Sequence, residues 1–219
     1  MFNGGTSFGW MNGANSDGTS YSPYVTSYDY GAPLNEAGQI TPRYRVFRQA
    51  ISEATGKVAS ALPLANATIQ IAEFSALRAA SLWTALPNET ASGLPVPMEE
   101  WNQAYGYALY RTTISKPTRG ELSLPSFNDH ATIYLNGKFV GTLDRRLNQK
   151  PLRMNVTNAD AQLDVLIGNT GRAYFTRATQ GENKGLSGPA YFDGRALTQW
   201  SMYGLSMENV EQLDFSENT

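Results

Sequence analysis

Short β-rich stretches separated by turn residues fill the sequence from Met98 onward, and they limit the possible fold more than any other feature. In residues 105–114 (YGYALYRTTI), aromatic and β-branched residues alternate between two faces, as is typical of a strand. Residues 131–135 and 139–143 flank Asn136-Gly137, a strong signal for a β-hairpin. Further strands are expected at 163–167, 191–192 and 200–203. Because no repeat of fixed period occurs, this spacing predicts a β-sandwich or jelly roll over residues 98–219.

Residues 42–55 (PRYRVFRQAISEAT) have the pattern of an amphipathic helix. Thr41 suits the N-cap, Pro42 suits the first helical position, and Gly56 suits the end. Apolar side chains recur at helical spacing and form one face, namely Tyr44, Phe47, Ala50, Ile51 and Ala54. This face needs a partner to cover it.

The segment between the helix and the strands, residues 57–97, is expected to be a connector. Four prolines interrupt it, and only residues 67–74 have strand character, since Ile69 and Ile71 alternate with other residues. For residues 75–86 the pattern leaves a short helical turn and a strand equally open.

Composition excludes several classes of protein. The chain has 219 residues, a formal net charge of −2 and 41% hydrophobic residues, as in an ordinary globular protein. The 17 basic and 19 acidic residues are spread evenly along the chain, which argues against nucleic-acid partners. No apolar run of about 18 residues occurs, which argues against a membrane span. No signal-peptide pattern follows Met1. With no cysteine and a single histidine, His130, neither thiolate chemistry, a His-rich metal site nor a Ser-His-Asp triad is expected. We expect no cofactor and no metal.

The opening stretch, residues 1–33, combines aromatic residues with Gly, Asn and Ser, which mark loops. A turn is expected at Gly4-Gly5. Aromatic rings on loops suit a sugar pocket, because the C–H faces of a pyranose lie on rings while Asn, Asp and Tyr oxygens hold its hydroxyls. The alternative is a disordered leader, although such leaders are poor in aromatic residues.

Two segments of this stretch resemble the glycoside hydrolase family 35 β-galactosidases. Residues 2–15 (FNGGTSFGWMNGAN) are similar to the family's F-x-G-G-T-N-F-x-x-x-N-G-A-N, and residues 26–38 (TSYDYGAPLNEAG) to its T-S-Y-D-Y-D-A-P-L-x-E-A-G. The resemblance implies that residues 1–56 are the last strand, loop and helix of a TIM (β/α)8 barrel. Ser7 stands where the family usually has Asn, and Gly31 where it usually has Asp.

The β-rich half carries the same resemblance. Residues 105–112, 128–145 and 163–172 follow the family's Y-G-x-x-L-Y-R-T, D-R-A-x-V-x-V-x-G-x-x-x-G-x-L-x-R and L-D-I-L-V-E-N-M-G-R. His130 replaces the usual Arg and Gly168 the usual Glu, so an ion pair of the family is expected to be missing. About nine-tenths of the chain aligns, and we expect the seven earlier barrel strands and the following jelly roll of the family to lie outside this sequence.

The resemblance also implies a chemistry, retaining hydrolysis by two glutamates about 5 Å apart. In the family both glutamates follow earlier barrel strands, in the contexts V-x-x-E-N-E-Y-G and E-x-x-x-G-W, which do not occur here. Asn35-Glu36 and Asn88-Glu89 imitate one context but lie in turn sequence, so no catalytic residue is expected. Tyr30 aligns with a tyrosine that contributes its hydroxyl to galactose, and it is predicted to bind substrate in the complete enzyme. Its alternative role is a core tyrosine that ties the loop to the barrel.

Other conspicuous residues are expected to be structural. Asp29 is expected to accept backbone N–H bonds. Four tryptophans are expected to pack, with sugar stacking as the alternative for the last three: Trp10, Trp83, Trp101 and Trp200. Charged residues at strand ends are expected to form ion pairs: Arg111, Asp144, Arg145 and Arg172. His130 is expected at the start of a strand, as a surface or turn residue.

Three functions stay open on this reasoning. The chain is a segment of a family 35 β-galactosidase that is inactive alone, a carbohydrate-binding β-domain, or a structural β-domain. The expected partners are a β-galactoside in the full-length enzyme and the missing N-terminal barrel segment, with no nucleic acid and no membrane. Localisation is periplasmic or secreted if a leader precedes the full-length protein. An exposed apolar face on the helix at 42–55 would favour the first or the third function.

Overall fold

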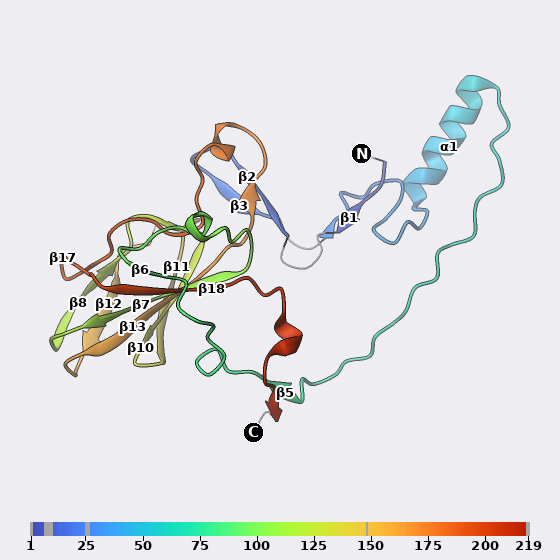
Figure 1. The fold of residues 1–219 in the computed structure, drawn as a ribbon. Helices are drawn as coiled ribbons and strands as arrows, with labels where there is room; N and C mark the ends of the chain where they lie inside the picture. The colour runs from blue at the N-terminus through green and yellow to red at the C-terminus, as the bar shows by residue number, and fades with distance from the viewer. Residues whose placement is uncertain (1, 7–10, 25–26, 148, 218–219) are drawn as a thin grey trace. The chain divides into compact units, whose positions relative to one another are not determined.

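The computed structural model describes residues 2–6, 11–24, 27–147 and 149–217 (Figure 1). The predictions that concern Ser7 and Trp10 lie outside these residues. Contacts divide the chain into two units. We call residues 1–12 and 24–75 the N-terminal unit, and residues 13–23 and 76–219 the β-domain. The predicted boundaries place residues 13–23 with the barrel segment, whereas in the structure their contacts are with the β-domain.

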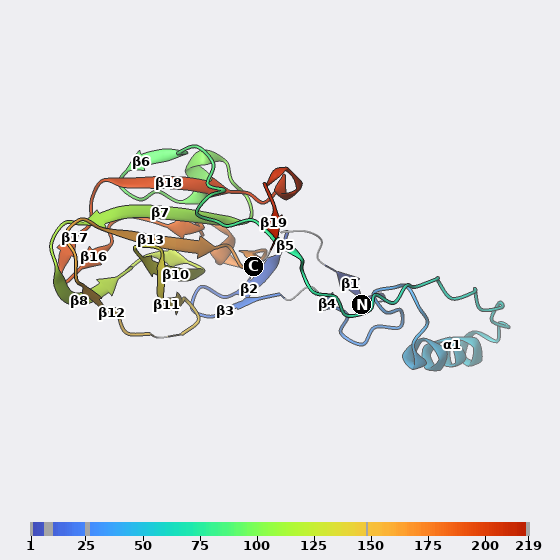
Figure 2. The same cartoon turned by 90° about the horizontal axis from the view of Figure 1, so that it is seen from below.

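The β-domain is built on a six-stranded sheet in the order β11-β10-β13-β7-β18-β6, with every neighbouring pair antiparallel (Figure 2). Its strands are β6 (Ala91–Gly93), β7 (Tyr107–Ile114), β10 (His130–Leu135), β11 (Lys138–Asp144), β13 (Ala161–Gly168) and β18 (Trp200–Leu205). A second sheet has the order β12-β8-β16-β17. Its strands are β8 (Thr118–Ser123), β12 (Leu152–Val156), β16 (Tyr191–Phe192) and β17 (Arg195–Ala196).

Smaller elements complete the β-domain. A three-stranded sheet contains β2 (Gly13–Ser16), β3 (Tyr21–Pro23) and β14 (Arg172–Ala173). Two-stranded pairs join β9 (Phe127–Asn128) to β15 (Gly185–Leu186), and β5 (Arg78–Ala79) to β19 (Ser216–Glu217). Single helical turns of the 3-10 type are η1 (Met98–Trp101), η2 (Arg177–Thr179) and η3 (Val210–Gln212).

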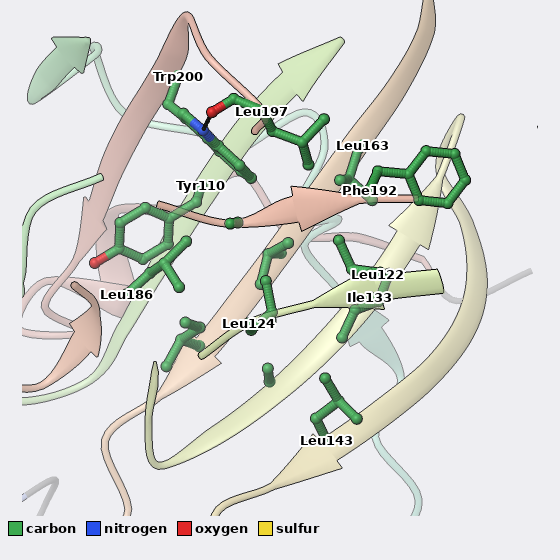
Figure 3. Close-up of a cluster of buried hydrophobic side chains, with 14 of the residues drawn as sticks. Tyr110, Leu122, Leu124, Ile133, Leu143, Leu163, Leu186, Phe192, Leu197 and Trp200 are labelled. Atoms are coloured by element: carbon green, nitrogen blue, oxygen red, sulfur yellow. Dashed lines mark hydrogen bonds between the residues drawn. The ribbon is translucent and has the colours of Figure 1, made fainter. Parts of the chain in front are cut away.

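The core of the β-domain lies between the two larger sheets (Figure 3). Strand alternation places Tyr110, Val165 and Ile133 side by side on the inner face of the six-stranded sheet, and all are fully buried. Leu122 and Phe192 of the second sheet join the same cluster. Each such side chain contributes about 1.5–3 kcal/mol by leaving water. The sequence prediction of a mainly β fold with a β-sandwich domain is confirmed.

Two hairpins follow the turn chemistry of the sequence. Asn136 and Gly137 adopt φ of 50° and 73° between β10 and β11, and Asp193 and Gly194 adopt φ of 50° and 73° between β16 and β17. Two consecutive left-handed residues match the twist of the flanking strands, and Asn-Gly and Asp-Gly adopt this conformation at low cost. The predicted hairpin at Asn136-Gly137 is confirmed.

The N-terminal unit contains β1 (Gly5–Thr6) paired with β4 (Ser27–Tyr28), and the helix α1 (Pro42–Thr55). The helix is confirmed, and Gly56 ends it with a φ of 66°. Thr41 occupies the N-cap position, but its side chain makes no capping bond. Instead its hydroxyl is shared between the carbonyl oxygens of Ala32 and Pro33, which accept from it at 3.0 and 2.9 Å. The predicted N-cap position of Thr41 is confirmed, although its side chain does not cap the helix.

The predicted strand at residues 67–74 is also wrong. Residues 57–77 have no regular secondary structure, and the side chains of Ile69 and Ile71 are 87% and 73% exposed. An alternating pattern becomes a strand only when a neighbouring strand accepts its backbone hydrogen bonds, and here none does. In the segment left open, residues 78–79 form the short strand β5, and residues 81–85 form a turn in which the N–H of Ala85 donates to the carbonyl oxygen of Ser81 at 3.0 Å, so each alternative holds for a part of it. Among the described residues, no helix combines the length and the apolar run needed to cross a membrane.

Candidate functional site

The turn that carries Tyr30 directly follows β4. Tyr30 and Gly31 both adopt left-handed backbone conformations, with φ of 53° and 60°. The Asp29 carboxylate accepts the N–H of Ala32 at 3.2 Å, which confirms its predicted role. The side chain of Tyr30 is 66% exposed, whereas Ala32 is buried. The turn therefore presents the Tyr30 ring at the surface of the N-terminal unit, and the alternative of a core tyrosine does not hold within this chain.

Backbone hydrogen bonds fix this turn from both sides. The N–H of Gly4 donates to the carbonyl oxygen of Leu34 at 2.8 Å. The N–H of Leu34 donates to the carbonyl oxygen of Phe2 at 3.1 Å. A Cβ on Gly4 would lie 3.1 Å from the Cα of Asp29, so glycine is required by the close approach of two chains. The predicted turn at Gly4-Gly5 is wrong, because Gly5 belongs to the strand β1.

The two glutamates that imitate a catalytic context lie in different units of the chain. Glu36 is exposed in a turn of the N-terminal unit, and Glu89 is exposed in the β-domain without regular secondary structure. Neither follows a strand end. Within the described residues, no group of three or more Asp, Glu or His side chains could hold a metal ion.

The β2–β3 hairpin, residues 13–23, is a feature that the sequence analysis missed. Its first strand pairs in parallel with β14, where Gly13 and Ala14 face Arg172 and Ala173. A Cβ on Gly171 would lie 2.4 Å from the carbonyl oxygen of Gly13, so the hairpin packs on this backbone without a gap. The hairpin is therefore a strand addition to the β-domain, although it comes from the opening loop.

Four charged residues lie beneath this hairpin and form what we call the charge cluster: Asp129, Arg145, Glu182 and Lys184. The ammonium of Lys184 is fully buried and lies 2.8 and 3.0 Å from the two Asp129 oxygens and 3.0 Å from Glu182 Oε1. Arg145 Nη1 bonds Asp129 Oδ1 at 2.8 Å and Glu182 Oε1 at 2.5 Å. Two cations thus neutralise two carboxylates, which suits structure rather than acid–base catalysis.

Tyr21 of the hairpin lies against both cations of the charge cluster. The guanidinium carbon of Arg145 is 4.1 Å from the ring centroid, and Lys184 Nζ is 4.8 Å from it. The Tyr21 hydroxyl donates to the carbonyl oxygen of Gly171 at 2.6 Å and lies 2.9 Å from Thr170 Oγ1. Cations against a desolvated aromatic face contribute about 2 kcal/mol each.

Electrostatic effects in this region follow from burial and pairing. Burial, together with the charge of Asp129, raises the pKa of the Tyr21 phenol, so the ring is held neutral. Burial alone would raise the pKa of the Glu182 carboxyl, but hydrogen bonds from Lys184 and Arg145 outweigh it and lower that pKa. Glu182 therefore remains ionised at neutral pH.

Comparison with known proteins identifies the family to which this chain belongs. Residues 95–206, half of the chain, match the family model described as β-galactosidase, first all-beta domain, and residues 1–54 match that of glycosyl hydrolases family 35. The chain belongs to glycoside hydrolase family 35. Its two matches follow the same order as the N-terminal unit and the β-domain.

Curated relatives agree with this assignment. The β-galactosidase of Xanthomonas manihotis is 42% identical over 97% of this chain and 36% of its own length. The β-galactosidases of Mus musculus and Homo sapiens are 34% and 32% identical over 95% and 96% of this chain, and 33% and 32% of their own lengths. The chain thus spans about a third of the relatives that it matches, and it is a segment of a larger family 35 protein.

The departures from the family pattern lie next to each other in the sheet. His130 on β10 faces Gly168 on β13, so the two positions where the family usually has Arg and Glu are cross-strand partners. A Cβ on Gly168 would lie 3.0 Å from the ring of Tyr107, which occupies this side of the residue. Gly168 has no side chain that could pair with His130, and the Tyr107 ring lies beside it instead. His130 begins β10, which agrees with the predicted strand start, and it is half-buried.

The remaining predicted residues are structural in this family 35 segment. Ion pairs join Arg111 to Asp164, Arg145 to Asp129, Arg146 to Asp144 and Arg172 to Glu99, which confirms the predicted pairing. Trp200 is buried in the core and donates to the carbonyl oxygen of Leu197 at 3.1 Å (Figure 3). Trp101 packs against the same core, and Trp83 lies edge-on to Tyr134 at 5.0 Å.

Proposed function

We propose that this chain is the closing part of a longer retaining β-galactosidase that hydrolyses terminal β-D-galactosyl residues. In this proposal residues 1–56 end the catalytic barrel, residues 57–97 connect, and residues 98–219 form the first β-domain, to which residues 13–23 are added. The names of the relatives and the order of the two family matches support it. The catalytic glutamates are expected in the part of the full-length protein that this chain does not span, so the chain alone is expected to be inactive.

The observation that carries the proposal is the uncovered face of α1. None of its residues is buried, and the side chains of Phe47 and Ile51 are 49% and 62% exposed. Tyr44, Phe47, Ile51 and Val58 line an open groove of about 440 Å³ beside the helix. The outer helices of a (β/α)8 barrel cover its strands with such a face. A self-contained binding module has no need for this helix.

Tyr30 is our candidate for a substrate contact. Its turn is fixed by hydrogen bonds within the N-terminal unit, and its ring projects outward, where the rest of a barrel could close around a sugar. A Cβ on Gly31 would lie 3.8 Å from Arg43 Nη1, so the aspartate that is usual in the family would stand next to a guanidinium. Glycine at this position removes that charge from the rim of the proposed pocket.

The purified chain is expected not to hydrolyse a chromogenic β-galactoside, because it lacks the two carboxylates that a retaining mechanism requires. The full-length protein is expected to hydrolyse it. Tryptophan fluorescence of the chain serves as the control, since the buried Trp200 reports a folded β-domain. Turnover by the folded chain, abolished by Glu36→Gln or Glu89→Gln, would contradict the proposal.

In the full-length protein, Tyr30→Phe is expected to lower kcat/KM for the galactoside about tenfold, because one hydrogen bond to a sugar hydroxyl is lost. Tyr203→Phe in the β-domain is the matched control and should leave kcat/KM within about twofold of the wild type. Equal values for the wild type and Tyr30→Phe would remove Tyr30 from the substrate site.

A further inference from the structure

The six-stranded sheet has an outer face, opposite the core, and the rest of the β-domain covers only part of it (Figure 2). Leu109 lies on this outer face, because its neighbour Tyr110 lies on the inner one, and it is nevertheless fully buried. Leu82 and Val210 line an apolar groove of about 410 Å³ together with Leu166, the cross-strand partner of Leu109. The covered part of the outer face is therefore apolar.

The adjacent part of this face is a row of side chains, one from each of five neighbouring strands. We call it the outer row: Ser201, Arg111, Asp164, Tyr134 and Phe139. Each residue is the cross-strand partner of the next, so all five lie on one face. Because neighbouring strands are about 4.8 Å apart, the outer row is about 19 Å long. The side chain of Phe139 is 64% exposed, and Tyr134 is half-buried. The outer row is thus an extended surface that solvent reaches.

One end of the outer row is aromatic, and its rings are held by packing. The rings of Tyr134 and Phe139 lie edge to face, with centroids 6.2 Å apart and an angle of 72°. Trp83 packs against Tyr134 in the same manner, at 5.0 Å and 82°. Rings that are already fixed lose little conformational entropy when a ligand binds. The exposed surface of Phe139 can therefore accept the C–H face of a pyranose.

The middle of the outer row carries hydrogen-bonding groups that a buried carboxylate fixes. Asp164 is fully buried, and it accepts bonds from Arg111 Nε at 2.6 Å and from Gln162 Nε2 at 2.7 Å. Because a carboxylate only accepts, the Gln162 amide must present its nitrogen to Asp164, which leaves its oxygen on the other side. Among the described residues, none bonds that oxygen or Arg111 Nη1. An acceptor and a donor thus stand ready next to the rings.

We propose that the outer row binds an uncharged oligosaccharide of β-linked galactose. The charges of Arg111 and Asp164 neutralise each other, so the row has no net charge to attract an acidic ligand. Exposed ring surface next to fixed hydrogen-bonding groups matches the C–H faces and hydroxyls of a sugar. An open row of this length contacts several sugar units rather than one. The choice of galactose units rests on the proposed function, whereas the row itself is a property of the β-domain.

The test titrates this chain with a β-linked galactose tetrasaccharide in a calorimeter. Phe139→Ala removes the exposed ring and is expected to weaken binding about tenfold. Gln162→Met has a similar length but no amide, and it is expected to weaken binding about fivefold. Galactose alone fills only part of the outer row, so it should bind at least about tenfold more weakly than the tetrasaccharide.

Phe215→Ala is the matched control for the ring. Phe215 is also exposed, by 39%, but it lies outside the outer row, so its replacement should leave the affinity within about twofold. The melting temperature of each variant shows that the chain is folded. The inference is overturned if the folded wild-type chain does not bind the tetrasaccharide, if galactose binds as tightly, or if the two phenylalanine variants bind alike.

The full-length protein shows whether the outer row is accessible in the complete enzyme. In a native gel that contains β-galactan, the wild type and Phe215→Ala are expected to be retarded more than Phe139→Ala. Equal retardation of all three would show that another segment of the protein covers the row, and it would overturn the inference. Neither experiment measures turnover, so a full-length protein that binds but does not hydrolyse galactosides would overturn the proposed function alone.

Discussion

Replacing Lys184 by methionine is expected to destabilise the β-domain by about 3–5 kcal/mol, because it leaves buried carboxylates with half of their positive charge. Lys184 is fully buried and bonds both Asp129 and Glu182. Methionine has a similar length and keeps most of the packing, so the loss reports the ammonium group. The measurement is urea unfolding of this chain, followed by the fluorescence of the buried Trp200.

Arg153→Met provides the control for this prediction. Arg153 pairs with Glu121 at 3.0 Å, but the two side chains are 88% and 49% exposed. Water already solvates such a pair, so this substitution should cost about 0–1 kcal/mol. If the two variants unfold at the same urea concentration, the charge cluster does not stabilise the fold.

Replacing Gly106 by alanine is the second large effect that we expect, with a loss of about 3 kcal/mol or more. Gly106 has a φ of 83°, and a Cβ there would lie 2.2 Å from the carbonyl oxygen of Leu205. That atom belongs to the backbone at the end of β18, so it cannot rotate away. The methyl group would separate the entry of β7 from β18, its neighbour in the sheet.

Gly137→Ala isolates the contribution of the backbone conformation. Gly137 has a φ of 73°, close to that of Gly106, but no atom lies within 4 Å of its Cβ position. Only the cost of a left-handed alanine remains, about 1–2 kcal/mol. Thermal unfolding of both variants checks the prediction, and an equal fall in melting temperature would show that the clash at Gly106 is relieved by movement of the strands.

The elements that the sequence predicts well are those set by local chemistry. Pro42, Gly56 and the apolar spacing between them determine α1, and Asn136-Gly137 determines a hairpin, because the favoured backbone angles are properties of these residues. The alternation of apolar and other residues at 67–74 does not produce a strand, because no described strand pairs with this segment.

The docking of residues 13–23 could not be predicted, since nothing local marks it. The hairpin has the Gly, Asn and Ser content of the rest of the opening loop. Its partners, Gly171 and the charge cluster, lie far along the chain, and Lys184 by itself has no sequence signal for burial. A basic residue is usually solvated, and only the three-dimensional fold brings two carboxylates to it.

The bond between Tyr21 and Gly171 joins residues 150 positions apart, which has a consequence for the order of folding. During synthesis, residues 13–23 would leave the ribosome long before Gly171 and β14, on which they pack. Contacts of such long range are slow to form. This hairpin would therefore be among the first parts of the chain to be made and among the last to reach its place.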